Sequence, residues 1–373
     1  MPERRPATRV VHAGLPAPQQ GEPFLPGPTF AAPFHLAGDA HAAPYGYHRE
    51  GNPTWTRYEA ALGELEGGDV LVFSSGMAAA GAVLLGLLDA GSVLVAVSDG
   101  YPAVRQIAAD DLRPAGCEVR LVPTDEQALR DALDGATLVW VETPSNPRLD
   151  VLDLEALARD VHAAGALLAV DNTLATPLAQ RPLELGADVV MASATKALSG
   201  HSDLLLGYVA VREPGHLARM RAWRERVGAI AGPFETWLAH RSLATLDVRL
   251  QRQCANALAI ATALRDDGRV SSVRYPGLPD DPGHEVAARQ MGGLFGPVVA
   301  FELPSADEAQ RFLAACSIVA EATSFGGVHT SAERRARWGS DDVSEGFIRL
   351  SAGLEDADDL VADLRGALDA TLA

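Results

Sequence analysis

The sequence predicts an α/β protein whose large domain is built on a mostly parallel seven-stranded sheet, followed by a smaller α+β C-terminal domain. Three observations lead to this prediction. Short β-rich runs alternate with helical patterns between residues 67 and 211. Several of these runs are apolar at every position, which is typical of parallel strands buried on both faces. The chain of 373 residues exceeds one typical domain, so a second domain is expected.

The N-terminal half supplies the predicted sheet. Residues 1–45 are rich in Pro, Gly and Ala and are interpreted as an extended arm that wraps over a neighbour. A helical pattern at Thr56–Glu66 ends at a pair of glycines. Seven strands are then predicted, at Val70–Ser74, Val93–Ser98, Glu118–Val122, Leu138–Glu142, Leu167–Asp171, Val189–Ser193 and Leu205–Ala210. The crossover helices are predicted at Gly76–Leu88, Ala103–Ala115, Gln127–Leu133 and Leu154–Ala164.

The C-terminal part has a different pattern. Long helical stretches at Leu217–Val227 and Thr236–Leu264 precede a mixed tail. The tail is predicted to contain strands near Val298–Glu302 and Phe347–Ser351 and helices near Asp307–Ala315 and Asp358–Leu372. We therefore divide the chain into an arm (1–45), a large domain that carries the ligand site (46–232) and a small domain (233–373).

Composition limits the class of protein. The chain has 31 basic and 49 acidic residues, a formal net charge of −18, which disfavours nucleic acid and anionic membranes as partners. No apolar run is long enough to cross a bilayer, and no apolar stretch follows the N-terminal arginines as in a signal peptide. Cys117, Cys254 and Cys316 are far apart and are interpreted as reduced thiols of a cytoplasmic protein. Neither a catalytic cysteine nor a metal site is predicted.

Lys196 is the only lysine in the chain, because the other 30 basic residues are arginines. It directly follows Ser193, Ala194 and Thr195 at the end of an apolar strand. Burial there disfavours the ammonium form, and a neutral amine is what imine formation with an aldehyde requires. A strand-edge lysine that extends to water is the alternative. The uniqueness of this lysine favours the functional interpretation.

Other polar motifs also follow predicted strands, at the sheet edge where ligands collect in α/β proteins. Ser74–Met77 opens a helix whose free amides suit a phosphate, although a tight strand–helix turn explains the same residues. Asp171 ends an apolar strand and is suited to a protonated heterocyclic nitrogen, with a salt bridge or helix cap as the alternative. Asn146 lies between two prolines in Glu142–Pro147 and presents an amide, unless the loop is only a structural turn.

An amine, a carboxylate and a phosphate cradle are the parts that a pyridoxal 5'-phosphate (PLP) site requires. With these motifs, the chain resembles the cystathionine γ-lyase, cystathionine γ-synthase and methionine γ-lyase family of PLP enzymes. The resemblance extends over nearly the whole chain and implies the PLP-dependent transferase fold type I. The matching motifs are Val11–Gly14, Tyr47–Thr54, Ser75–Met77, Glu142–Pro147, Asp171–Thr173, Ser193–Asp203 and Ile348–Asp356.

The resemblance implies a role in cofactor binding for the residues that match these motifs. Lys196 would hold the cofactor and later move protons, Asp171 would pair with the ring nitrogen, and Asn146 would bond the ring oxygen. The phosphate would be bound by Gly76, Met77, Ser193 and Thr195. Tyr47 and Arg49 match a segment that reaches the phosphate from the adjacent subunit. A homo-oligomer, as a dimer of dimers with shared active sites, is therefore expected.

The resemblance also implies residues that handle the substrate. Tyr101 would stack over the cofactor ring and protonate the leaving thiolate, although its local sequence departs from the more common Tyr-Gly-Gly-Thr, and a loop-anchoring tyrosine is the alternative. Arg349 would grip the substrate α-carboxylate through paired hydrogen bonds. Ser324 would sit beside the lysine and tune the substrate's position. Arg105 would meet the distal end of cystathionine, or else is a solvated helix arginine.

The predicted activity is a PLP-dependent carbon–sulfur lyase that converts cystathionine to cysteine, 2-oxobutanoate and ammonia by α,γ-elimination. Methionine γ-lyase, cystathionine γ-synthase and a lyase for an unusual thioether in secondary metabolism remain open, as do a simple transaminase and a non-catalytic binding protein. The segment from Val328 to Trp338 departs from the family pattern. Its arginines, Arg334, Arg335 and Arg337, are interpreted as a solvated basic face rather than as contacts to an anionic substrate arm.

Overall fold

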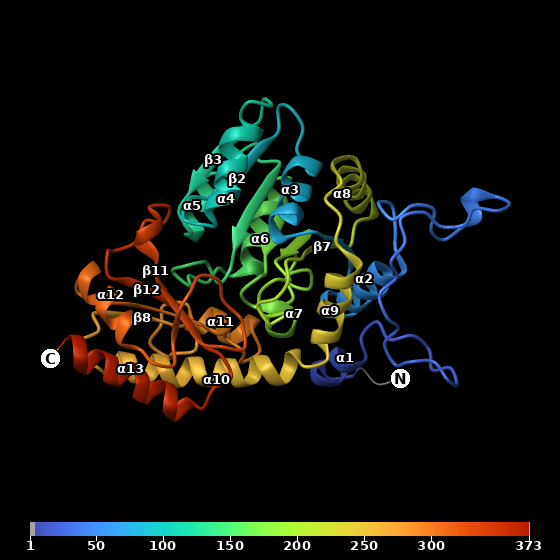
Figure 1. Ribbon diagram of the computed structural model, residues 1–373. Coiled ribbons are helices and arrows are strands. Elements are labelled where there is room, and N and C mark those ends of the chain that lie inside the picture. Colours follow the sequence, from blue (N-terminus) through green and yellow to red (C-terminus); the bar gives the residue numbers. More distant parts are fainter. Residues whose placement is uncertain (1–3, 373) are drawn as a thin grey trace.

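Two β-sheets organise the computed structural model, which describes residues 4–372 (Figure 1). The first sheet has seven strands in the order β1-β7-β6-β5-β4-β2-β3. These strands are β1 (Asp69–Phe73), β2 (Val93–Val97), β3 (Glu118–Val122), β4 (Leu138–Glu142), β5 (Leu167–Asp171), β6 (Val189–Ala192) and β7 (Gly207–Val211). Only β7 is antiparallel to its neighbours, β1 and β6. The predicted seven-stranded, mostly parallel sheet is confirmed.

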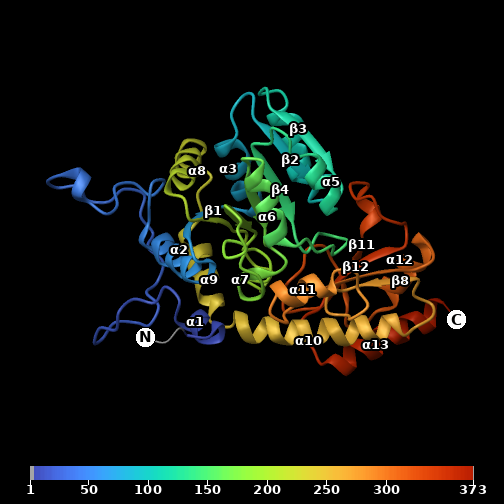
Figure 2. The ribbon, with the colours of Figure 1, turned by 180° about the vertical axis from the view of Figure 1, so that it is seen from behind.

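Helices cover both faces of this sheet (Figures 1 and 2). They are α2 (Pro53–Glu66), α3 (Gly76–Leu87), α4 (Pro102–Gln106), the π-helix η2 (Ile107–Leu112), α5 (Glu126–Asp131), α6 (Leu154–Ala163), α7 (Thr176–Ala179) and α8 (Pro214–Val227). Along β2, Leu94 and Ala96 pack on the side of α3, while Val95 and Val97 pack on the side of α6. Burial of both faces explains why the strands are apolar at every position.

One predicted helix of the large domain is shorter than expected. The pattern at Ala103–Ala115 predicts a continuous helix, but the chain forms α4 and then η2, which ends at Leu112. Pro114 lies two residues later and has no amide N–H with which to continue the hydrogen bonds of the helix. Gly116 then adopts a left-handed conformation, with φ of 92°.

The small domain is built on a five-stranded sheet in the order β10-β11-β12-β9-β8. The remaining elements are α9 (Pro233–Leu243), α10 (Leu246–Arg265), β8 (Ser272–Arg274), α11 (His284–Gln290), β9 (Val298–Glu302), α12 (Ala306–Ala315), β10 (Ala320–Glu321), β11 (Ser331–Arg334), the 3-10 helix η3 (Arg335–Trp338), β12 (Phe347–Ser351) and α13 (Ala357–Thr371). Residues of α10, α12 and α13 share one apolar core with this sheet. The expected α+β architecture is confirmed, but β8, β10 and β11 are short and partly polar and were not predicted.

The helical pattern at Thr236–Leu264 is divided into two helices. It breaks between α9 and α10, where Thr245 leaves the helical conformation. Helix α9 packs with α2 in a large-domain core, whereas α10 runs along the base of the small domain (Figure 2). The domain boundaries drawn from the sequence stay predictions.

The predicted arm is only partly extended. Helix α1 (Pro6–His12) packs beside α2, with Val10 and Ala13 buried. Seven residues are too few to show a helical period in the sequence. Beyond α1 the chain is irregular apart from the short 3-10 helix η1 (Ala40–Ala42), and it projects from the body with Phe24 and Phe30 exposed (Figure 1). Residues 1–3 of the predicted arm and residue 373 of the predicted small domain lie outside the described residues.

Within residues 4–372, no helix combines the length and the apolar character needed to cross a membrane.

Candidate active site

A cavity of about 250 Å³ opens at the carboxyl ends of β4, β5 and β6, against the sheet of the small domain. Because β7 is antiparallel to both β1 and β6, β1 runs parallel to β6. The carboxyl end of β1 therefore lies at the same edge of the sheet as those of β4, β5 and β6. The cavity brings together ten of the residues singled out from the sequence. They are Gly76, Met77, Tyr101, Asn146, Asp171, Ser193, Thr195, Lys196, Ser324 and Arg349.

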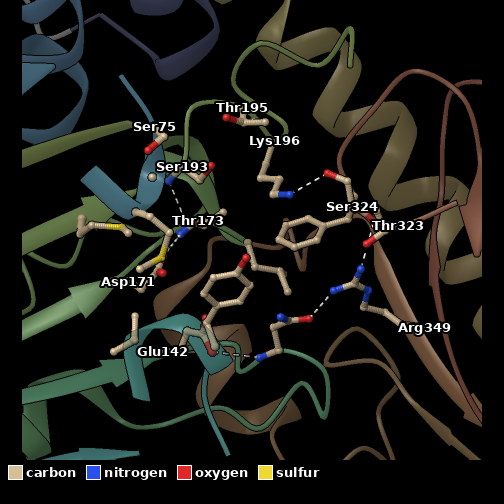
Figure 3. Close-up of a pocket in the computed structure, with 18 of the residues that line it drawn as sticks. Ser75, Glu142, Asp171, Thr173, Ser193, Thr195, Lys196, Thr323, Ser324 and Arg349 are labelled. Atoms are coloured by element: carbon tan, nitrogen blue, oxygen red, sulfur yellow. Dashed lines mark hydrogen bonds between the residues drawn. The ribbon is translucent and has the colours of Figure 1, made fainter. Parts of the chain in front are cut away.

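Lys196 points into this cavity rather than to water (Figure 3). Its Nζ donates a hydrogen bond of 2.6 Å to Ser324 Oγ and lies 5.0 Å from the centre of the Phe325 ring. Burial and the nearby positive charge of Arg349 lower the pKa of Lys196 to about 8. A substantial fraction of the amine is therefore neutral in mildly alkaline solution, as a nucleophile or a base must be.

Two carboxyl groups lie side by side below the lysine, because Glu142 and Asp171 are register partners at the ends of β4 and β5. Asp171 accepts a hydrogen bond of 2.9 Å from the Thr173 backbone amide. Burial raises the pKa of Asp171, against the hydrogen bonds from Thr173 and the charge of Lys196. Burial and the adjacent Asp171 raise the pKa of Glu142 well above its usual range. We assign the proton of the pair to Glu142 and the negative charge to Asp171.

The start of α3 forms the polar end of the cavity. Ser75 caps the helix, with its Oγ accepting a hydrogen bond of 3.1 Å from the Ala78 amide. A Cβ at Gly76 would lie 2.8 Å from the Cβ of Ser193, so only glycine allows this close approach. The first amides of the helix have no acceptor within it. Together with Ser193 and Thr195 they make a cradle that suits a phosphate.

Arg349 forms the opposite wall, from the middle of β12 in the small domain (Figure 3). It is buried and donates hydrogen bonds of 2.6 Å to Asn146 Oδ1 and to Glu333 Oε1, and one of 3.2 Å to the carbonyl of Ser324. Burial and the neighbouring Arg335 lower the pKa of Arg349 to about 10, so it remains a cation at neutral pH.

The interpretation of Arg334, Arg335 and Arg337 as a solvated face is wrong for Arg335. This residue is 6% exposed, lines the cavity, and forms ion pairs of 2.6 Å with Glu333 and 2.7 Å with Asp341. Arg337 is more exposed and pairs with Glu321. Sequence reasoning missed Glu333 and Asp341 altogether. For Glu333 a signal existed in the departure of its segment, Val328 to Trp338, from the family pattern, but Asp341 lies beyond that segment.

Glu142 was also missed as a separate site residue, although it lies in a motif that was noted. A signal existed, because it ends a buried apolar strand just as Asp171 does.

Three predicted residues are not among those that line the cavity within the described part of the chain. Arg105 lies on α4, and its guanidinium donates to the carbonyl of Ser340 at 2.5 Å. Tyr47 is exposed, and Arg49 lies 5.6 Å above its ring while donating to the carbonyl of Glu225 at 3.2 Å. Their roles toward a distal substrate group and an adjacent subunit stay predictions.

The chain is similar to known proteins over nearly its whole length. A family model described as "Cys/Met metabolism PLP-dependent enzyme" matches residues 7–369. A "Putative cystathionine gamma-lyase" of Streptomyces coelicolor is 59% identical over 369 residues, covering 98% of this chain and 93% of that protein.

Solved structures show the same similarity. That of cystathionine gamma synthase from Xanthomonas oryzae pv. oryzae in complex with cystathionine superposes with a TM-score of 0.93 at 35% identity, covering 98% of each chain. That of apo CalE6, a methionine gamma lyase from Micromonospora echinospora, gives a TM-score of 0.92 at 36% identity, covering 99% of this chain and 100% of the other.

Proposed function

This chain belongs to the family of Cys/Met metabolism PLP-dependent enzymes, and from that premise we propose that it is a carbon–sulfur lyase acting on cystathionine. The reaction is α,γ-elimination to cysteine, 2-oxobutanoate and ammonia. One observation carries the proposal: the only lysine of the chain lies in a cavity between the buried carboxylate of Asp171 and the buried guanidinium of Arg349. The 59% identity with a putative cystathionine γ-lyase supports this choice of thioether.

The residues of the cavity fit PLP, the cofactor of the family. The cradle at Gly76, with Ser193 beside it, has room and free amides for the phosphate, and Asp171 is a buried acceptor for a protonated ring nitrogen. Lys196 would hold the cofactor, Tyr101 and Asn146 flank the space for its ring, and Met77 and Thr195 complete the phosphate end. When bound, PLP supplies the electron sink that stabilises negative charge developing at the substrate carbons.

Proton transfer is the task we assign to Lys196. Its Nζ takes the proton from the substrate α-carbon, which requires the neutral amine. The depressed pKa makes this form accessible near neutral pH. Ser324 Oγ, 2.6 Å from Nζ, restricts where the amine points while it acts.

Substrate orientation is the task we assign to Arg349 and its neighbours. Its guanidinium binds the α-carboxylate, and Asn146 holds it at a fixed angle through the hydrogen bond of 2.6 Å. Tyr101 lies at the mouth of the cavity, 44% exposed, where its hydroxyl can protonate the thiolate that leaves. Arg105, one turn further on α4, is proposed to meet the distal end of cystathionine after releasing Ser340.

A homo-oligomer belongs to the same proposal. Tyr47 and Arg49 are both exposed and follow the segment that projects from the body, so they are available to reach the phosphate site of a second copy. We propose a dimer of dimers on this basis. A cytoplasmic location is supported by Cys117, Cys254 and Cys316, which are all free thiols.

The second candidate keeps the same site but changes the substrate. Similarity to a cystathionine γ-synthase and to a methionine γ-lyase supports γ-replacement or the cleavage of methionine. A thioether lyase of secondary metabolism stays within the same chemistry. A binding protein without activity is disfavoured, because Lys196, Asp171 and Arg349 converge on one cavity.

The decisive experiment offers the PLP-loaded enzyme cystathionine, methionine, homocysteine and an activated homoserine ester, and measures thiol, keto acid and ammonia. We expect cysteine and 2-oxobutanoate from cystathionine in equal amounts. A simple transaminase would instead yield an amino-transfer product without free thiol. Methanethiol as the main product from methionine, with cystathionine untouched, would contradict the proposal.

A further inference from the structure

A buried chain of ion pairs runs from Arg349 away from the cavity. Glu333 Oε1 accepts 2.6 Å hydrogen bonds from both Arg349 and Arg335. Arg335 continues the chain to Asp341, whose Oδ2 accepts a hydrogen bond of 2.8 Å from Nε and forms an ion pair of 2.7 Å with Nη2. In the side chains of all four residues at most 8% of the surface is exposed. Such pairs are rigid, because breaking one leaves an uncompensated buried charge.

Glu333 is held at both of its oxygens. Oε2 accepts a 2.9 Å hydrogen bond from Trp338 Nε1, and Oε1 also accepts one of 3.1 Å from Thr323 Oγ1. In the sheet, Glu333 of β11 is the direct register partner of Arg349 of β12. Backbone pairing and side-chain contacts therefore place the same carboxylate against the same guanidinium.

We propose that Arg335 is a positioning residue for substrate binding: anchored by Asp341, it holds Glu333 in place, and Glu333 presents the Arg349 guanidinium to the substrate α-carboxylate. The inference rests on the proposed function only in taking Arg349 as the carboxylate-binding group. Arg335 acts through two other residues and takes no part in proton transfer.

The charges of the four residues explain why Arg335 matters for an anionic ligand. Arg349 and Arg335 carry two positive charges, and Glu333 and Asp341 carry two negative charges, so the group is neutral before substrate binds. Without Arg335, two carboxylates remain for one guanidinium. The group then has a net negative charge, which repels an incoming carboxylate in a site poorly screened by water. Glu333 also loses the contact that restrains it.

The test measures ligand binding by PLP-loaded enzyme, through the change in visible absorbance of the bound cofactor. Glycine is the first probe, and methylamine, which is glycine without its carboxylate, is the matched second probe. We expect Arg335→Met to weaken glycine binding tenfold to a hundredfold and to leave methylamine binding within twofold. Equal weakening of both probes, or no weakening of either, overturns the proposal.

A milder variant guards against a folding defect in Arg335→Met. Arg335→Lys keeps the charge but cannot make the two-point contact with Asp341. We expect glycine binding to fall threefold to tenfold, with methylamine binding unchanged. The double variant Arg335→Met/Asp341→Asn removes one charge of each sign, and we expect it to recover part of the lost affinity for glycine. If the double variant recovers none of the lost affinity, the electrostatic part of the proposal is wrong.

Arg274→Met is the matched structural control. Arg274 of the small domain also joins two carboxylates, Asp150 of the large domain and Asp281 of the small domain, at 3.0 Å each, but it does not line the cavity within the described residues. We expect this variant to lower the melting temperature and to leave glycine binding within twofold. If Arg274→Met weakens glycine binding as much as Arg335→Met, the effect of Arg335 is structural and the proposal fails.

Two further outcomes separate this proposal from a direct contact between Arg335 and the substrate and from the proposed lyase activity. If Arg335→Met weakens the binding of cystathionine but not of glycine, Arg335 contacts the distal arm directly and the positioning role is wrong. If the wild-type enzyme eliminates thiol from no thioether while glycine binding follows the expected pattern, the proposed lyase activity fails and the positioning role stands.

Discussion

The two walls of the cavity are built in different ways. The large-domain wall comes from the ends of parallel strands, where Asp171 ends one continuous apolar run and Lys196 lies four residues after another. The small-domain wall comes from two antiparallel strands, of which β11 holds only four residues, three of them polar. In the proposed function, the first wall carries the chemistry of proton transfer and the second recognises the substrate carboxylate. A site can therefore have one half that is evident in the sequence and another that depends on pairing between short strands.

The largest expected effect is on the large-domain wall. Lys196→Ala removes the group that moves the α-proton, and we expect turnover of cystathionine to fall by about 10²- to 10⁴-fold or more. The visible absorbance band of the lysine-bound cofactor should disappear with it. Ser324→Ala is the control, because it removes only the hydroxyl beside the amine and should cost far less. Retained turnover in Lys196→Ala would remove Lys196 from the mechanism.

The next effect tests the small-domain wall. Arg349→Met removes hydrogen bonds to a charged ligand, each of which contributes roughly 1.5–3 kcal/mol. We expect kcat/KM to fall about tenfold to a hundredfold, mainly through a higher KM. Arg334→Met, at the residue directly before Arg335 and paired with Glu345, should change KM by less than about twofold. Similar losses in both variants would contradict the assignment of Arg349.

The pH dependence of stability separates the two walls further. The pKa of Lys196 is lowered by burial from 10.5 to about 8 in the folded chain. Between pH 8 and 10.5 the unfolded chain therefore binds more protons than the folded one, and this group makes stability rise with pH. Below pH 8 the Lys196 amine is charged in both states, so the full cost of burying the ammonium lowers the free energy of unfolding.

The measurement is the free energy of unfolding of cofactor-free protein by denaturant, from pH 7 to 10. Burial of the Lys196 ammonium should make wild type less stable relative to Lys196→Met at low pH. We expect this deficit in the free energy of unfolding to shrink as the pH rises through about 8. A difference that stays constant with pH would show that the amine is not desolvated. Arg349 supplies such a slope only toward the upper end of this range, because its lowered pKa is about 10.

The smallest effect concerns the pair of carboxyl groups. If Glu142 carries the proton, Glu142→Gln conserves both shape and charge, and we expect kcat/KM within about threefold of wild type and a stability change of less than about 1 kcal/mol. Asp171→Asn, which removes the charge from the other member, should lower kcat/KM far more. Equal losses of kcat/KM in the two variants would contradict the assignment of the proton to Glu142.

Much of the large-domain wall could be predicted from residue order alone. Parallel strands place their carboxyl ends at one edge, so motifs that follow Val170, Ala192 and Phe73 must meet, whatever their distance in sequence. The helix over Ala103–Ala115 was predicted too long, because periodicity alone gave too little weight to Pro114. Arg335 was interpreted as solvated because a run of arginines is usually exposed.

The sequence by itself determined the chemistry of this protein: one lysine, one carboxylate at the end of an apolar strand, and a glycine that opens a helix. These signals are local, because each depends on a residue and the strand directly before it. Only the tertiary structure decided which charges are buried together. Glu333, Arg335 and Asp341 meet Arg349 because β11 pairs with β12 and η3 turns back over them, and the cost of burying one charge depends on where its partners lie in space.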